Sequence, residues 1–224
     1  MIAESLLESA DLPTHERVYR ALRGRILAGE MAPGDQVTLR GLAEALGVSM
    51  TPAREAVRRL VAERALEMTT SGRAEIPTPG LARLAELFRA RELLEPELAM
   101  RALPNADKAA ISTLRAIDQT IDGYLAKGDA VGYVRANTAF HTTLYGLANA
   151  PALMALVESV WLQTAPVMRR IYGRLGTAAL TDYHEAALAA LASGDTTALA
   201  DAIRQDVVQG AALLRQVALD ESDL

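Results

Sequence analysis

The feature that most constrains the fold is a pair of short amphipathic segments that meet at Gly47-Val48-Ser49. Apolar residues recur at the helical period on both sides of this break. Thr38 can cap the first helix, and Thr51 can cap the second, with Pro52 at its first helical position. The apolar residues that would hold the two helices at a fixed angle are Leu42, Ala43, Leu46, Val48, Ala53, Val57 and Leu60.

A further helix and a hairpin flank this pair. A helix is expected over residues 14–28, and Gly29 ends it. Apolar residues no longer follow the helical period in residues 66–78, and a turn at Thr70-Ser71-Gly72 predicts a small β-hairpin. Three helices followed by a two-stranded hairpin is the order of a winged helix-turn-helix. The prolines of Pro77–Gly80 forbid a continuous helix, so we place a domain boundary there.

Residues 1–79 are thus predicted to form a winged helix-turn-helix domain that begins with a flexible arm of about 13 residues. Residues 80–224 are predicted to form an all-helical domain. Its six helices are expected at 80–103, 105–127, 129–148, 151–173, 178–193 and 195–219. The fold class is mostly α, in keeping with a content of only 4% aromatic residues and few β-branched ones.

Charge is unevenly distributed along a chain whose net charge is −5. Residues 17–73 hold ten arginines and six acidic residues, a net of +4, whereas the chain from Gly80 onward has a net of −4. Arg54, Arg58 and Arg59 are expected on the outer face of the third helix, which fits the DNA major groove. Arg73 on the hairpin can reach the backbone or the minor groove. The alternative is an ordinary three-helix pack with a solvated arginine face.

Several classes of protein are disfavoured. The chain has no cysteine, which excludes disulfides and thiolate zinc sites. No apolar run approaches the roughly 20 residues that a bilayer span needs, and no export signal is visible. We expect a cytoplasmic protein with no membrane association.

The run "RILAGEMAPGDQVTLRGLAEALGVSMTPAREAVRRLVAERAL" resembles the DNA-binding domain of the GntR family of bacterial transcription regulators. The resemblance implies that a winged helix-turn-helix binds a short palindromic operator in double-stranded DNA. This sequence departs from the family pattern at Met50, where arginine is usual, and at Arg64, where glycine is usual. The DNA contacts implied by the resemblance fall on Arg40, Ser49, Thr51 and Arg54, and the basic surface adds Arg58 and Arg73.

Histidine is scarce, and two of the three histidines lie in the predicted bundle. His141 follows Asn137 by four residues, so both lie on one helix face. His184 and Asp206 belong to later helices. Imidazole and carboxylate groups that converge in a bundle can bind a divalent cation. Equally, a lone histidine on an amphipathic helix is more often a partly buried hydrogen-bonding group.

The stretches "LFRARELLEPELAMRAL", "NTAFHTTLYGLANAPAL" and "DYHEAALAALASGDTTALADAIRQD" are similar to the FCD effector-binding domain of the FadR-type branch of that family. Many members bind a metal through D-x-x-x-H and two later histidines. The resemblance places the ligands at Asn137, His141, His184 and Asp206, two of them with changed donors, and favours zinc or nickel. A metal-free pocket stays open as the alternative.

The family holds a small carboxylate with arginine near this site, and Arg91 matches the arginine on the first helix of the domain. Arg169, Arg170 and Arg174 are weaker candidates. The resemblance implies a homodimeric regulator, commonly a repressor, that responds to a small organic acid. Two rival readings remain: a metal-dependent enzyme acting on a small carboxylate, against which no nucleophile–base pair is apparent, and an architectural DNA-binding protein without an effector.

Overall fold

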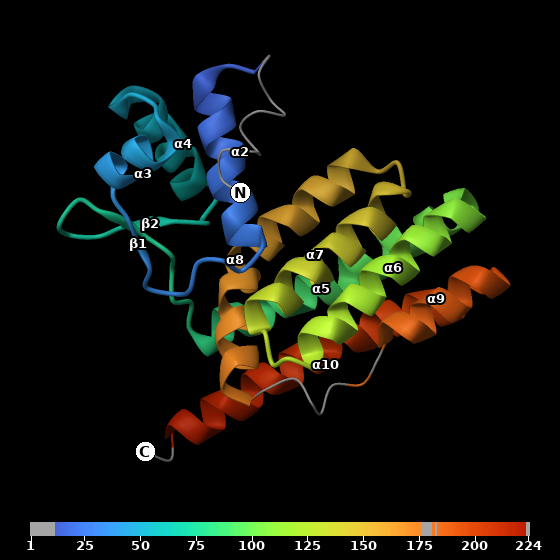
Figure 1. The fold of residues 1–224 in the computed structure, drawn as a ribbon. Helices are drawn as coiled ribbons and strands as arrows, with labels where there is room; N and C mark the ends of the chain where they lie inside the picture. Colours follow the sequence, from blue (N-terminus) through green and yellow to red (C-terminus); the bar gives the residue numbers. More distant parts are fainter. Residues whose placement is uncertain (1–11, 176–180, 182, 223–224) are drawn as a thin grey trace.

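The computed structural model describes residues 12–175, 181 and 183–222, without the side chains at 174, 175 and 217–222. The predicted flexible arm falls largely on residues outside this part of the chain. Two lobes are apparent in Figure 1: a small N-terminal lobe and a larger helical bundle, with the long helix α8 (Pro151–Leu175) passing between them. Among the described residues, none of the helices has the length and apolarity that crossing a membrane requires.

The N-terminal lobe contains α2 (Thr14–Leu27), α3 (Leu39–Leu46) and α4 (Met50–Ala62). These helices pack through buried apolar side chains that include Leu22, Ile26, Val57 and Leu60. Leu162 of α8 joins the same cluster, so the lobe rests on the bundle through an apolar contact. The winged helix-turn-helix predicted from the sequence is confirmed.

The predicted hairpin is part of a three-stranded antiparallel sheet. Strands β2 (Glu67–Met68) and β3 (Ala74–Glu75) pair as expected, and β1 (Gln36–Val37) adds to the other edge of β3. β1 was not predicted, because two residues are too few to show the alternation that marks a strand.

The turn between α3 and α4 corrects one prediction. Gly47 ends α3 in the left-handed conformation, with φ of 62°. The next residues reverse the chain, so Ser49 is the extended residue before α4, and Thr51 lies inside the first turn rather than capping it. Pro52 is still tolerated, because the first four N–H groups of a helix have no intrahelical partner. The predicted cap at Thr38 is confirmed, since its side chain accepts a hydrogen bond from the Gly41 N–H.

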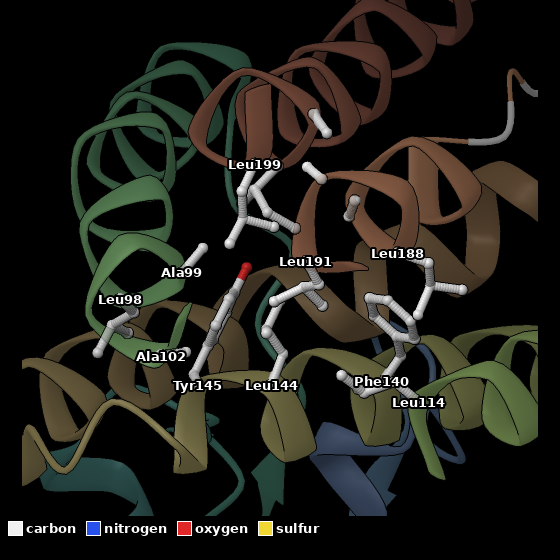
Figure 2. Packing of buried hydrophobic residues seen from close by; sticks show 14 of the residues in the cluster. Leu98, Ala99, Ala102, Leu114, Phe140, Leu144, Tyr145, Leu188, Leu191 and Leu199 are labelled. Carbon is white, nitrogen blue, oxygen red and sulfur yellow. The ribbon is translucent and has the colours of Figure 1, made fainter. Parts of the chain in front are cut away.

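In its described residues, the bundle is built from six α-helices in the predicted order, with a short 3-10 turn (Leu103–Asn105) after the first. They are α5 (Leu81–Ala102), α6 (Lys108–Leu125), α7 (Ala130–Gly146), α8, α9 (Tyr183–Ser193) and α10 (Thr196–Ser222). Figure 2 shows the packing at the centre, where Phe140, Leu144 and Tyr145 of α7 lie among leucines of α9 and α10.

The two lobes meet closely where α2 ends. Gly29 has a φ of +64°, and a Cβ at this position would lie 2.7 Å from Cγ1 of Val134 on α7. Two backbone carbonyls beside it accept hydrogen bonds from the bundle: Thr138 donates to the Leu27 carbonyl at 3.1 Å and Arg169 to the Glu30 carbonyl at 2.6 Å. The end of α2 is therefore held by α7 and α8.

Candidate DNA-binding surface and metal centre

Four of the predicted DNA-binding residues surround one surface hollow. Arg40, Arg54, Arg58 and Arg73 line a depression between the start of α3, the exposed face of α4 and the β2–β3 hairpin. All four side chains belong to exposed residues. Arginine can pair with guanine through two hydrogen bonds or with phosphate, so this surface has the chemistry of a DNA-binding face.

The arginines on this face differ in how far they are neutralised. Arg40 is paired with Glu44 at 2.8 Å, although both side chains are highly exposed. Arg73 donates to the Gln36 side chain at 3.1 Å. Within the described part of the chain, neither Arg54 nor Arg58 has an acidic partner. These two cations of α4 are the ones most available to an anion.

The N-terminal end of α4 adds small polar groups to the same face. Ser49 and Thr51 are exposed there, and Met50 between them is 41% exposed. The free N–H groups of a helix N-terminus favour a phosphate oxygen. Met50 presents a thioether in the position where the family places arginine, so it can offer only an apolar contact.

Arg59 corrects an expectation, because it faces away from this surface. Its guanidinium carbon lies 3.6 Å from the centre of the Tyr19 ring, and it binds Glu16 and Glu63 at 2.8 and 3.2 Å. Arg59 therefore joins α4 to α2, although it directly follows the outward-facing Arg58 in the sequence. Consecutive arginines on a helix point about 100° apart, which separates Arg58 from Arg59.

The bundle brings together three of the four predicted metal ligands. His141 Nε2 lies 3.2 Å from an oxygen of Asp206, and His184 Nε2 lies 3.4 Å from His141 Nε2. His184 Nε2 and the other Asp206 oxygen are 4.0 Å apart. One potential donor atom from each residue thus falls within 4.8 Å of the other two. The third histidine, His15, lies on α2 beside Glu55, in the other lobe.

Each imidazole has a polar partner at Nδ1, on the side of the ring opposite Nε2. His141 Nδ1 lies 3.0 Å from the Tyr145 hydroxyl, and His184 Nδ1 lies 3.3 Å from a carboxylate oxygen of Asp118. Such contacts fix the orientation of a metal-binding histidine and leave the opposite nitrogen for the metal. The arrangement directs both Nε2 atoms toward Asp206.

Asp206 is the anionic member of the cluster. Burial disfavours its ionised form, but the hydrogen bond from the protonated His141 ring and the charges of His141, His184 and Arg91 outweigh burial and lower the pKa of Asp206 to about 2. Asn137, the remaining predicted ligand, lines the same cavity. Its side-chain oxygen is buried without a hydrogen-bond partner in the described part of the structure. A buried acceptor in that state is costly unless something binds it.

Arg91 is the effector-binding candidate that the structure places at this centre. Its residue is only 8% exposed, and it lines the cavity with Asn137, His141 and Asp206. Arg91 Nε donates to Glu95 at 2.6 Å. Burial opposes the charge of Arg91, but the neighbouring Glu95 carboxylate prevails and raises the pKa of Arg91, so the guanidinium stays charged.

The other arginine candidates are not brought to the cavity. Arg170 is exposed and lines a separate hollow beside Pro79 and Leu81, which does not support the predicted effector role. Arg169 binds the Glu30 carbonyl at the junction of the lobes. The side chain of Arg174 lies outside the described part of the structure.

Sequence reasoning missed four buried polar residues around the site: Glu95, Asp118, Tyr145 and Trp161. Glu95 follows Arg91 by four residues, and this spacing was a usable signal for a paired carboxylate. Asp118 and Trp161 carry no such signal, because their neighbours at the site come from other helices. Tyr145 follows His141 by four residues, but a tyrosine at this spacing is equally typical of the apolar core.

The cavity combines a cluster of potential metal-ligating atoms with a buried cation. Its free volume is about 40 Å³, and its apolar wall includes Val134, Ala165 and Met168. A water needs roughly 10–15 Å³ of such space, so the cavity has room for about three. Histidine nitrogens with a carboxylate suit a divalent metal, and a guanidinium suits a carboxylate.

Comparisons with known proteins agree with both lobes. The family model described as bacterial regulatory proteins, gntR family, matches residues 14–76, and the FCD domain model matches residues 86–209. The HTH-type transcriptional regulator McbR of Escherichia coli K12 is 28% identical over 203 residues, which cover 89% of this chain and 92% of McbR.

Solved structures show the same arrangement over nearly the whole chain. That of E. coli McbR/YncC has a TM-score of 0.85 at 27% identity, and covers 92% of this chain and 99% of its own. A GntR transcriptional regulator from Rhodococcus sp. RHA1 has a TM-score of 0.71 at 25% identity, and covers 89% of this chain and 97% of its own. The likeness therefore spans the small lobe and the bundle together.

Proposed function

The chain belongs to the GntR family of bacterial transcription regulators with a C-terminal FCD domain, and from this premise we propose a metal-assisted sensor of a small organic acid that represses transcription. It is a DNA-binding regulator that responds to a ligand. The observation that carries the finer proposal is the convergence of two imidazole Nε2 atoms and a carboxylate beside the buried guanidinium of Arg91.

At the DNA, Arg54 and Arg58 are the principal contacts. They lack acidic partners within the described residues and lie on the exposed face of α4. Ser49 and Thr51 accompany them at the helix start, while Arg40 and Arg73 reach the flanking phosphates from α3 and the hairpin. Two copies pair through the bundle and bind a palindromic operator, because a two-fold dimer matches a two-fold site. Chromosomal DNA as partner places the protein in the cytoplasm.

In the bundle, His141, His184, Asp206 and Asn137 hold a divalent cation, zinc or nickel. The residues fit such an ion because two imidazole Nε2 atoms 3.4 Å apart lie beside a carboxylate, and nitrogen and oxygen donors of this kind suit a divalent metal. The Asn137 oxygen, unpartnered within the described residues, supplies a fourth donor. A bound ion supplies positive charge for the effector carboxylate.

Arg91 grips the effector. Its Nε is occupied by Glu95, which leaves the other guanidinium nitrogens for a carboxylate. The cavity volume of about 40 Å³ favours an acid of only a few non-hydrogen atoms. No step of turnover is assigned to the site, because Glu95, the carboxylate beside Arg91, is already bound by three donors.

The signal passes through α7. Val134 and Thr138 line the cavity, and the same two residues contact the end of α2 at Gly29 and Leu27. An acid that binds the two arrangements of the lobes unequally shifts the balance between them and releases the operator.

Metal content tests the site. The double variant His141→Ala/His184→Ala is expected to lose its metal by elemental analysis while it still binds operator DNA. His15→Ala is the matched control, since it removes the remaining histidine from the other lobe. Equal metal content in all three proteins would discard the site.

A thermal-shift screen with small carboxylates tests the effector. A binding acid raises the melting temperature of the native protein. Arg91→Lys, which lacks the planar fork, is expected to lose this shift, whereas Arg170→Lys keeps it. The same acid is expected to weaken binding to the DNA upstream of the protein's own coding region, and tighter binding would reverse the proposed direction of control.

A further inference from the structure

Glu95 is the most completely enclosed carboxylate near the cavity. Its residue is 0% exposed, and it accepts hydrogen bonds from three helices. Arg91 Nε donates from α5 at 2.6 Å, the Tyr145 hydroxyl from α7 at 2.9 Å and Trp161 Nε1 from α8 at 2.9 Å. A carboxylate surrounded by this many donors is held in one position.

Tyr145 connects Glu95 to His141 of the proposed metal-binding cluster. A phenol has a single proton, and Tyr145 gives it to Glu95. Toward His141 Nδ1, 3.0 Å away, the Tyr145 oxygen can only accept.

We infer that Glu95 and Tyr145 are positioning residues that hold His141 in its Nδ1–H tautomer, so that the Nε2 lone pair points at the metal. Because Glu95 also binds Arg91 Nε, one buried anion aligns both a metal ligand and the arginine that faces the effector. The inference rests on the proposed metal site for its functional meaning, but the tautomer is a property of the protein alone.

The competing tautomer makes the role of Tyr145 necessary. His141 Nε2 lies 3.2 Å from an Asp206 oxygen, so an Nε2–H form could donate to Asp206. That form would place the proton where the metal has to bind. The Tyr145 oxygen is the nearer acceptor and is polarised by its own hydrogen bond to Glu95, which favours the productive form. Without the Tyr145 hydroxyl, the Asp206 contact remains.

Nitrogen NMR of full-length, chelator-treated protein labelled at histidine tests the inference. With only three histidines, the spectra of His→Ala variants assign each ring. The native His141 is expected to carry its proton on Nδ1 at a pH where the ring is neutral. In Tyr145→Phe the proton is expected to move to Nε2. A native His141 protonated on Nε2 would overturn the inference, whether or not the protein binds metal.

Zinc affinity measured by competition with a chromogenic chelator gives the second readout. Tyr145→Phe is expected to bind Zn²⁺ about 10–100-fold more weakly. Tyr19→Phe is the matched control, because Tyr19 is a buried tyrosine bonded to Glu63 in the other lobe. It is expected to leave zinc affinity and the His141 tautomer unchanged.

Glu95→Gln gives an independent variant if the phenylalanine protein does not fold. Its amide can donate to the Tyr145 oxygen and so remove the fixed direction of the hydrogen bonds, and a mixture of His141 tautomers is expected. Native-like zinc affinity together with an unchanged tautomer in either variant would refute the positioning role. Absence of zinc binding in the native protein with the Nδ1–H tautomer present would instead refute the proposed metal site alone.

Discussion

At the scale of single residues, Arg64 stands out because its backbone is in a conformation that favours glycine. Its φ is +59°. Its N–H bonds to the Val61 carbonyl and the Ala65 N–H bonds to the Leu60 carbonyl, the pattern that closes a helix through a left-handed residue. The same pattern closes α2, α3, α6 and α9 at Gly29, Gly47, Gly128 and Gly194.

Replacing Arg64 with glycine is therefore expected to stabilise the protein. A left-handed conformation costs a residue with a side chain roughly 1–2 kcal/mol, partly offset by the greater freedom of glycine in the unfolded chain. We expect a net gain of about 0.5–1 kcal/mol in the free energy of unfolding, measured by urea titration. Arg64→Ala keeps the strain and serves as control; an equal gain in both variants would attribute the effect to the lost charge.

Asp206 gives a prediction about acid stability in the absence of metal. Its pKa is lowered to about 2 from an ordinary value of 3.8. A carboxyl whose pKa is lower in the folded state stabilises the protein above pH 4, and the contribution disappears as the pH falls through 2. The native protein is expected to lose about 2 kcal/mol more than Asp206→Asn between pH 5 and 2. Parallel curves from chemical denaturation would contradict this.

At the scale of elements, α4 carries two arginine functions on different faces. Arg54 is exposed and has no acidic partner in the described chain, whereas Arg59 is bound to Tyr19, Glu16 and Glu63. The first face is exposed and is the one proposed to contact DNA, and the second fastens α4 to α2.

Alanine at Arg54 and alanine at Arg59 are expected to change different properties: the first operator affinity, the second stability. Arg54→Ala should weaken operator binding by about 1–3 kcal/mol if it reads a base, with the melting temperature unchanged. Arg59→Ala should lower the melting temperature through its lost packing and ion pairs, with a much smaller effect on operator affinity. Fluorescence anisotropy and calorimetry measure the two quantities, and an Arg54→Ala protein with native affinity would remove Arg54 from the interface.

The elements also show how far a sequence can be interpreted. Glycine and proline mark the helix ends, so the six helices of the bundle and the winged helix-turn-helix were predictable. Strand β1 was not, because two residues show no periodicity. The convergence of His141, His184 and Asp206 was predicted from their helix positions and a family resemblance. Asp118 was not predicted, since its contact with His184 exists only where separate helices pack together, whereas Glu95 follows Arg91 by four residues on one helix and could have been found.

At the scale of the whole molecule, the contact at Gly29 joins the lobes. A Cβ there would lie 2.7 Å from Cγ1 of Val134, while a Cβ at Gly34, also at positive φ, would meet nothing within 4 Å. The two glycines therefore separate backbone strain from the cost of the interlobe contact.

Gly29→Ala is expected to destabilise the protein more than Gly34→Ala. Both variants incur about 1 kcal/mol for a side chain at positive φ. Gly29→Ala adds roughly 1–3 kcal/mol of overpacking against Val134. Urea unfolding measures both, and the double variant Gly29→Ala/Val134→Ala should recover part of the difference. Equal losses in the two single variants would mean that the junction is loose.

The position of Val134 has an evolutionary consequence. One face of this side chain bounds the cavity and another touches Gly29. A mutation that shortens the Val134 side chain to admit a larger acid also weakens the contact with Gly29, where the bundle meets the DNA-binding lobe. Under the proposed function, substitutions at position 134 that change which acid fits the cavity are expected also to change how strongly that acid alters DNA binding, so the two traits evolve together.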